Sequence, residues 1–168
     1  SQYSKIRFAE VNIEYRPGGE SGRGDYVRAR SSGPWEVTDT QKARLAELVN
    51  EVFPEELAKS DRFELVAESG PDVLLVTAEL LDVVSYVPPD PAGRSQVYLR
   101  RVGEATLVLE LRDSVTNAIL ARAVDRRAAE QPGQTMTWSN TVSNTAEVRR
   151  LVRRWASSLR ETLDALAD

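Results

Sequence analysis

The chain has 168 residues, of which 41% are hydrophobic and 29% are charged, and its formal net charge is −4. This length suits one compact domain with a sizeable core, and the composition is that of a folded protein. The acidic balance gives no basis for nucleic-acid binding, which usually needs a clear excess of basic residues. We therefore expect a single domain over residues 1–168 and no nucleic-acid partner.

The chain has no cysteine and no histidine, which limits the kinds of catalytic and metal-binding site that it can form. Disulfides, thiolate nucleophiles, zinc–thiolate sites and Ser-His-Asp mechanisms are thereby excluded. The sequence contains no EF-hand loop, P-loop or GxGxxG motif. We therefore expect no enzymatic activity, no cofactor and no resident metal. No run reaches the ~18 apolar residues of a membrane span, and no signal-peptide pattern starts the chain.

The first part of the chain predicts a strand followed by a helix. Residues 5–15 alternate between apolar and polar side chains, as a half-buried strand does. A helix is predicted from Thr38, which has capping-box spacing to Gln41. Pro54 predicts a kink near its end, followed by a second short turn. The apolar stripe of this helix consists of Leu45, Leu48, Val49, Val52 and Leu57.

The rest of the chain predicts strands and a final helix. Strands are expected over 62–69, 72–87 and 97–112, with a proline-rich loop at 87–96 and a polar loop at 130–140. The last helix is expected from about Thr145, with a capping box of Asn144 and Glu147. Its apolar stripe consists of Val148, Leu151, Val152, Trp155, Leu159, Leu163 and Leu166.

Alternation along two of these strands predicts how they pair. Most even positions of 72–87 and most odd positions of 97–112 are apolar, with Asp82 and Arg101 as exceptions, and these faces belong together. Pairing Val76 with Leu107 achieves this. The same register sets Asp82 opposite Arg101, which we interpret as a cross-strand ion pair on the core-side face.

Asp113 and Asp125 lie among arginines within residues 107–127, and either an acid/base site or a β-hairpin explains them. Pairing Leu111 with Ile119 keeps the apolar faces together and leaves 113–117 as the connection. Asp113 is then suited to the hydrogen bonds of a turn, and Asn117 is suited to the left-handed backbone conformation that a turn can require. Because this register puts Asp125 at the strand end, far from Asp113, we favour the hairpin.

A group of small residues on the predicted core face indicates where a large side chain packs. This group consists of Ala78, Gly103, Ala105 and Ala123. We expect Trp155 of the last helix to fill the space above them, since a buried aromatic side chain contributes a large apolar area.

Two segments resemble a known family: VGEATLVLELRDSVTNAILARAVDRR, at 102–127, and RRWASSLRETLD, at 153–164. They are similar to the bacterial family called domain of unknown function 3313 (DUF3313). Its Asp-Ser-x-Thr-Gly turn corresponds to 113–117, with Asn117 in place of glycine. Its Val-Gly-Gly sequence corresponds to 102–104, with Glu104 in place of the second glycine. The similarity extends from Ile6 to Leu163.

Members of that family are mostly described as lipoproteins of Gram-negative bacteria. The resemblance implies a domain on the periplasmic side of the cell envelope, anchored to the outer membrane through a lipid upstream of Ser1. The element order βαβββα also resembles envelope domains such as the amino-terminal domain of TolB. We therefore expect an α+β fold, with a single mixed, mostly antiparallel sheet and two long helices packed on one face. The matching motifs are structural and imply no reaction.

Three functions stay open. The first is a non-catalytic binding or scaffolding domain whose partner is an envelope protein, contacted by the loop at 87–96 and by Trp138. The second is binding of an anionic lipid or polyanion by arginines of the last helix. The third is an enzyme that uses Asp82, Glu79 or Asp90 with Mg²⁺ or Ca²⁺.

The arginines of the second hypothesis are Arg149, Arg150, Arg153 and Arg154. Like charges four residues apart on a helix repel each other, so we expect acidic counterparts. An anionic partner is one source of these. The alternative is a solvated helix face with internal pairs, such as Glu147 with Arg150.

Overall fold

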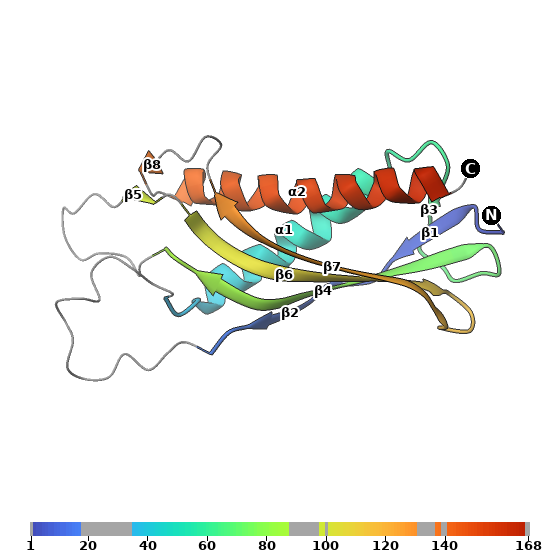
Figure 1. The fold of residues 1–168 in the computed structure, drawn as a ribbon, viewed down its shortest axis with the longest axis horizontal. Helices are drawn as coiled ribbons and strands as arrows, with labels where there is room; N and C mark the ends of the chain where they lie inside the picture. Colours follow the sequence, from blue (N-terminus) through green and yellow to red (C-terminus); the bar gives the residue numbers. More distant parts are fainter. Residues whose placement is uncertain are drawn as a thin grey trace.

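The structure is a computed structural model that describes residues 2–17, 35–87, 98–99, 101–130, 137–138 and 141–166. The strands of its main sheet are β1 (Lys5–Phe8), β2 (Asn12–Tyr15), β3 (Glu64–Leu65), β4 (Val73–Ser85), β6 (Arg101–Asp113) and β7 (Ile119–Glu130). The helices are α1 (Asp39–Leu57) and α2 (Thr141–Leu166), and a small separate ladder joins β5 (Tyr98–Leu99) to β8 (Thr137–Trp138). Both helices lie on the same face of the sheet (Figure 1). The predicted α+β fold is confirmed.

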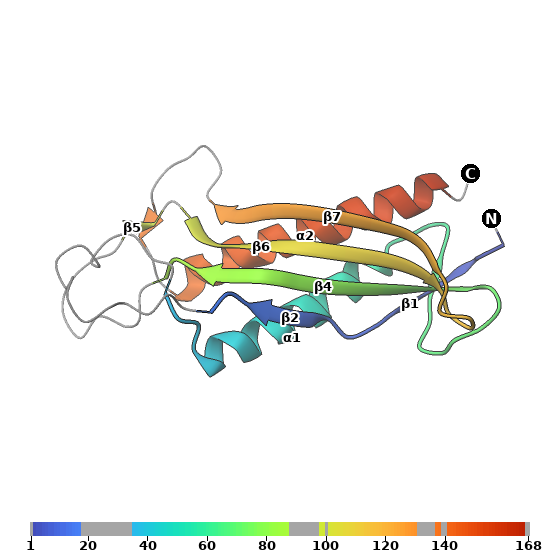
Figure 2. The ribbon, with the colours of Figure 1, turned by 60° about the horizontal axis from the view of Figure 1, so that its bottom comes forward.

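The sheet has the order β3-β1-β4-β6-β7, with β2 beside β4 further along the same edge (Figure 2). The β4–β6 and β6–β7 ladders are antiparallel and long, whereas β1, β2 and β3 add shorter parallel ladders. The strand predicted over 5–15 is therefore two strands. Between them, the Val11 N–H leaves the sheet and donates to Asn50 Oδ1 of α1 (3.1 Å).

The register of β4 against β6 differs from the prediction by four residues. Val76 pairs with Leu111 rather than with Leu107, which pairs instead with Leu80. Because four is an even number, side chains of β4 up to Leu81 stay on their predicted faces. Beyond Leu81 the ladder shifts by one more residue and Val84 pairs with Glu104, so the predicted faces do not hold there. Alternation therefore identified the faces correctly up to Leu81, and it could not distinguish registers that share them.

The predicted pair of Asp82 and Arg101 is wrong. Asp82 lies in a β-bulge, where the β4–β6 register shifts between Leu81 and Val84, and its φ is 56°. Its carboxylate forms an ion pair with Arg16 and lies 3.6 Å from Arg126. The hydrogen bond from Arg16 lowers the pKa of Asp82. Arg101 pairs with Glu130 in the β6–β7 ladder.

The predicted turn at 113–117 is confirmed. Asp113 Oδ1 accepts hydrogen bonds from the N–H of Thr116 (2.7 Å), the Thr116 hydroxyl and the N–H of Val115. These bonds, the Thr116 N–H foremost, together with the Tyr3 hydroxyl lower the pKa of Asp113 to about 2. Asn117 takes the left-handed backbone expected of it, with φ 60°. Asp113 is an ionised turn residue.

Asp125 is not the strand-end residue that was predicted. In β7 it lies opposite Leu107, because Leu111 pairs with Ala121 and the register is two residues from the predicted one. Its carboxylate accepts hydrogen bonds from Trp155 Nε1 (2.8 Å) and Arg127 Nε (2.5 Å). Asp125 therefore ties the edge strand to α2.

Trp155 packs in the core as predicted, with 3% of its surface exposed. Ala78 and Ala105 are buried, but Ala123 is exposed and does not lie under the tryptophan. Gly103 has a different reason to be small. A Cβ at that position would lie 2.6 Å from the Val84 carbonyl oxygen, so glycine permits the close approach of β6 to the bulge in β4.

Helix α1 begins with the predicted capping box. The Gln41 N–H donates to Thr38 Oγ1 (3.2 Å), and the Thr38 N–H donates to Gln41 Oε1 (2.9 Å). The predicted interruption at Pro54 is wrong, because the helix continues to Leu57. Phe53 and Leu57, on either side of the proline, are almost fully buried, and their packing compensates for the missing N–H.

Helix α2 begins at Thr141 rather than Thr145, so the predicted capping box of Asn144 and Glu147 is wrong. Most of the predicted apolar stripe is buried or half-buried, but Leu166 is 66% exposed. The predicted strand at 62–69 is reduced to β3. Neither helix in the described part is long and apolar enough to cross a membrane.

The first prediction concerns Trp155. Replacing it by alanine should lower the free energy of unfolding by about 3–5 kcal/mol, because a large buried ring is removed. Trp155→Phe should cost much less, about 1 kcal/mol for the lost hydrogen bond to Asp125 plus some packing. Urea unfolding followed by circular dichroism measures both. An alanine variant as stable as the wild type would show that Trp155 is not part of the core.

Candidate functional site

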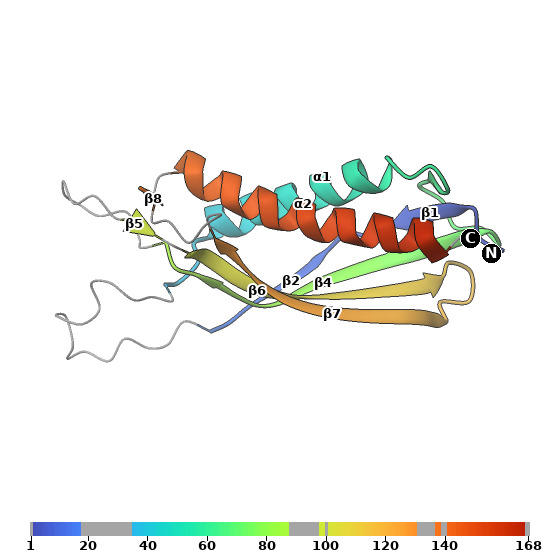
Figure 3. The ribbon, with the colours of Figure 1, turned by 45° about the horizontal axis from the view of Figure 1, so that its top comes forward.

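A cavity of about 230 Å³ lies at the end of the sheet where β4 finishes and β6 begins. The first turns of α1 and α2 line its other side without enclosing it, and Figure 3 shows the two helices side by side over this part of the sheet. Its main apolar walls are Leu45, Leu48, Leu80, Val83, Val102, Ala105, Val148, Val152 and Trp155.

The cavity exists because the sheet below it is lined by small residues. Ala105 and Ala129 are buried on the helix side of β6 and β7, and Gly103 lies beside them. Trp155 contributes one wall and leaves part of the space above these residues unfilled. Of the four small residues noted in the sequence, Gly103 and Ala105 line the cavity, whereas Ala78 and Ala123 do not.

Tyr15, at the end of β2, contributes its hydroxyl oxygen to the cavity wall. Among the described residues, this is the one buried side-chain polar atom of the wall without a hydrogen-bond partner. The Tyr15 hydroxyl is shielded from solvent. Burial raises the pKa of Tyr15 to about 12, so the group stays a neutral donor. Lys42 Nζ lies 5.2 Å from the centre of the ring.

Arg44 of α1 adds a positive charge to the cavity lining. Its side chain is exposed, and it forms no ion pair with any residue that the structure describes. The acidic residue in the lining, Glu104, is held by Arg126 Nη2 at 2.7 Å. The lining therefore combines aliphatic walls, a buried phenol and a cation that has no ion pair among the described residues.

The arginine band of α2 is mostly an ion-pair seam with α1. Arg149 lies 3.2 Å from Glu51, and Arg153 lies 3.3 Å from Glu56. Burial opposes ionisation of Glu56, but hydrogen bonds from Lys59 and Ser157 and the nearby Arg153 charge outweigh it and lower its pKa. The repulsion within the band is thus offset inside the molecule.

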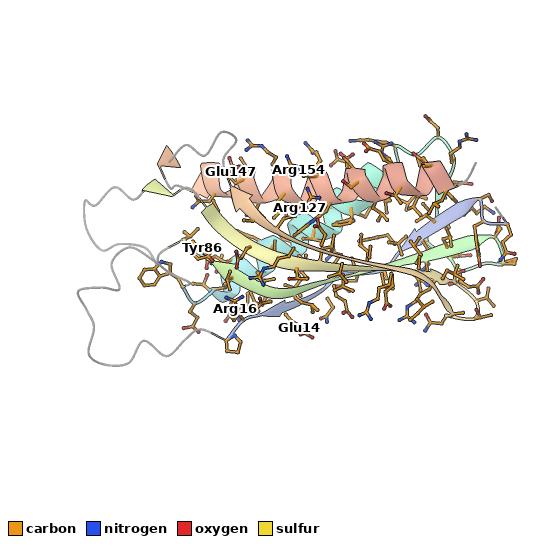
Figure 4. All side chains as sticks on the ribbon, in the orientation of Figure 1. Glu14, Arg16, Tyr86, Arg127, Glu147 and Arg154 are labelled. Atoms are coloured by element: carbon orange, nitrogen blue, oxygen red, sulfur yellow. The ribbon has the colours of Figure 1, made fainter. Side chains whose placement is uncertain are left out.

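The remaining two arginines differ from each other. Arg150 forms the expected pair with Glu147 (2.6 Å), a carboxylate that is 4% exposed. Arg154 is exposed and has no ion pair with the described residues. Figure 4 shows the side chains of Glu147 and Arg154 on α2.

The other sequence candidates are not brought together. Asp82 is engaged by Arg16, and Glu79 is exposed on β4, while Asp90 lies outside the described residues. Among the residues that the structure describes, no cluster of three or more side chains could hold a metal ion. The side chain of Trp138 and residues 88–96 of the proline-rich loop also lie outside them.

Comparison with known proteins identifies the family. The model of the family called "Protein of unknown function (DUF3313)" matches residues 1–159. The chain belongs to this family. The resemblance expected from the sequence is confirmed, and no curated protein matches the chain.

Solved structures support the fold. Protein XCC0632 from Xanthomonas campestris, of the DUF330 family, is 12% identical, with a TM-score of 0.53 over 94% of this chain and 82% of that one. Two lipoproteins are more distant in structure. Lipoprotein GNA1162 from Neisseria meningitidis is 11% identical, with a TM-score of 0.29 over 93% of this chain and 99% of that one. Rare lipoprotein B from Shewanella oneidensis is 13% identical, with a TM-score of 0.27 over 95% and 94%. Only the first likeness is close enough to support the fold, and it shows no more than that.

The second prediction concerns Tyr15. Tyr15→Phe should raise the stability of the ligand-free protein by about 1 kcal/mol, because it removes a buried hydroxyl that has no partner among the residues the structure describes. The melting temperature should rise by about 2–4 °C. Tyr3→Phe is the matched control, since the Tyr3 hydroxyl donates to Asp113 Oδ2 (2.9 Å) and its loss should destabilise. Calorimetry measures both, and a destabilised Tyr15→Phe variant would show that its hydroxyl is bonded in solution.

Proposed function

We propose that this chain is a non-catalytic binding domain of the cell envelope, and that the cavity holds the apolar part of its ligand. The cavity carries the proposal. It lies between rigid elements, its walls are mostly aliphatic, and a few polar groups converge on it, which is the usual composition of a ligand site.

The volume sets the size of the bound group. An engineered apolar cavity of about 150 Å³ is enough to bind benzene. Drug-sized ligands fill about 300–1,000 Å³. At about 230 Å³, the cavity suits one short hydrocarbon chain or a ring. Burying about 200 Å² of such a group would contribute about 5 kcal/mol, which corresponds to a Kd of about 0.2 mM.

The other candidate sites are less favourable. An anionic partner of the α2 arginines would compete with carboxylates that already pair with Arg149, Arg150 and Arg153. A carboxylate enzyme would need Asp82 free, but Arg16 holds it in an ion pair. The cavity has no such internal competitor in the described part of the chain.

The envelope placement is supported by the family. The resemblance of the 113–117 turn and the 153–164 helix is to lipoproteins of Gram-negative bacteria. We propose attachment to the outer membrane on its periplasmic side, through a lipid on a cysteine upstream of Ser1. The tethered domain would then meet apolar ligands in the periplasm or at the membrane surface.

The third prediction is that the cavity binds 1-decanol, and isothermal titration calorimetry measures this binding. The wild-type chain should bind it with a Kd of about 0.2 mM or tighter. Val148→Phe should abolish binding, because the half-buried Val148 lines the cavity and a phenyl group fills it. Leu109→Phe is the control, as Leu109 is half-buried on β6 but outside the lining. Equal binding by both variants would contradict the proposal.

The fourth prediction tests the location. Fractionation of the protein in its host should place it in the outer-membrane fraction. Mass spectrometry of its amino terminus should find a lipid-modified cysteine. An unmodified protein outside the membrane fractions would refute the lipid attachment to the outer membrane and leave the cavity proposal intact.

A further inference from the structure

We infer that the ligand of the cavity is a single-chain amphiphile with an anionic head group, whose tail occupies the cavity and whose head binds Arg44. The inference rests on the proposed function, because it names the chemistry of the ligand at the same site. It is carried by the way aliphatic walls, Tyr15 and Arg44 are combined in one lining.

The walls specify the tail. Leucine and valine side chains from α1, β4, β6 and α2 surround the space, and they offer no hydrogen bonds. A volume of about 230 Å³ is small beside the sites of drug-sized ligands, so it accommodates one chain rather than two. A diacyl lipid would have to leave its second chain outside.

Arg44 specifies the charge of the head. Most other basic side chains of the two helices have acidic partners, as Lys42 lies 4.0 Å from Asp39 and Arg149 pairs with Glu51. Arg154 is the exception among the described residues, and it lies outside the cavity lining. Arg44 lines an apolar cavity without an ion pair in the described part of the molecule. A guanidinium group binds carboxylates and phosphates through two parallel hydrogen bonds. The Glu104 carboxylate in the same lining is neutralised by Arg126 and does not set the charge of the site.

Tyr15 specifies a hydrogen-bond acceptor on the ligand. Its hydroxyl is buried in the lining and finds no acceptor among the described residues. A head-group oxygen would satisfy it and recover the free energy that the unmade bond costs. Tyr15 and Arg44 are therefore the two donors of the proposed head-group site.

Two sources provide this chemistry: free fatty acids and lysophospholipids. Both carry one hydrocarbon chain and an anionic group at its end. Decanoate and decanoyl lysophosphatidylglycerol distinguish them, and 1-decanol is the uncharged reference with the same chain length.

The test is calorimetric titration of these three amphiphiles, below their micelle concentrations, at neutral pH. Decanoate should bind the wild type more tightly than decanol does. Arg44→Gln should weaken decanoate binding about fivefold, as expected for an exposed charged contact, and leave decanol binding unchanged. Arg154→Gln removes an exposed α2 arginine outside the lining and should change neither.

Tyr15→Phe provides a second readout. It should weaken decanoate binding while the ligand-free variant melts at a higher temperature, a combination that a purely structural role would not produce. Lysophosphatidylglycerol binding with the same dependence on Arg44 would assign the head to a phosphate, and binding of decanoate alone would assign it to a carboxylate. Either result supports the inference.

Two outcomes overturn it. Equal affinity for decanol and decanoate, unaffected by Arg44→Gln, would remove the anionic head group and leave the apolar site standing. No binding of any of the three by a folded wild type would remove both the inference and the proposed function.

Discussion

The close approach of β6 to the bulge in β4 is the constraint on which this end of the molecule depends. Gly103 lets the Val84 carbonyl come within 2.6 Å of where a side chain would begin. The bulge at Asp82 shifts the register, and both Val83 and Val84 become buried. Ala105 and Ala129 near the bulge have small side chains. They leave space between the sheet and the two helices. The cavity is the result.

Different interactions hold the two helices in place over this part of the sheet. Helix α1 is fixed by its capping box and by the seam of carboxylates that meets the arginines of α2. Helix α2 is fixed by Trp155, which packs in the core and donates to Asp125 on the edge strand. The cavity is thus surrounded by contacts that hold α1 and α2 in place. The buried Tyr15 hydroxyl, which has no partner in the described part of the chain, adds a local cost at the same place. Such local costs concentrate at functional sites.

Much of the fold could be predicted, because it depends on periodicity and local chemistry. The cap of Thr38, the turn at Asp113 and Asn117, and the buried faces all follow from short-range patterns. The register of β4 against β6 did not follow from these patterns, because pairing Val76 with either Leu107 or Leu111 buries the same side chains. The prediction for Asp125 is wrong for the same kind of reason, whereas the prediction for Asp82 is wrong because that residue lies in a β-bulge. Pro54 was misread because tertiary packing of Phe53 and Leu57 overrides a local preference.

The candidate site was only partly predictable. The small residues indicated a space in the core, but nothing in the sequence showed that Trp155 would leave part of it open. Tyr15 and Arg44 carried no signal, because their importance comes from what surrounds them. The arginines of α2 form a charged band in the sequence, but the α1 partners of Arg149 and Arg153 lie about 100 positions away in the chain.

The central claim is that the cavity binds an apolar ligand in the native protein. The most direct measurement is crosslinking in living host cells with a photoreactive decanoate, followed by mass spectrometry of the wild type and Val148→Phe in parallel. The wild type should carry the probe on residues of the cavity lining, and the folded variant should not. No labelling of the wild type, or equal labelling of both proteins, would contradict the claim.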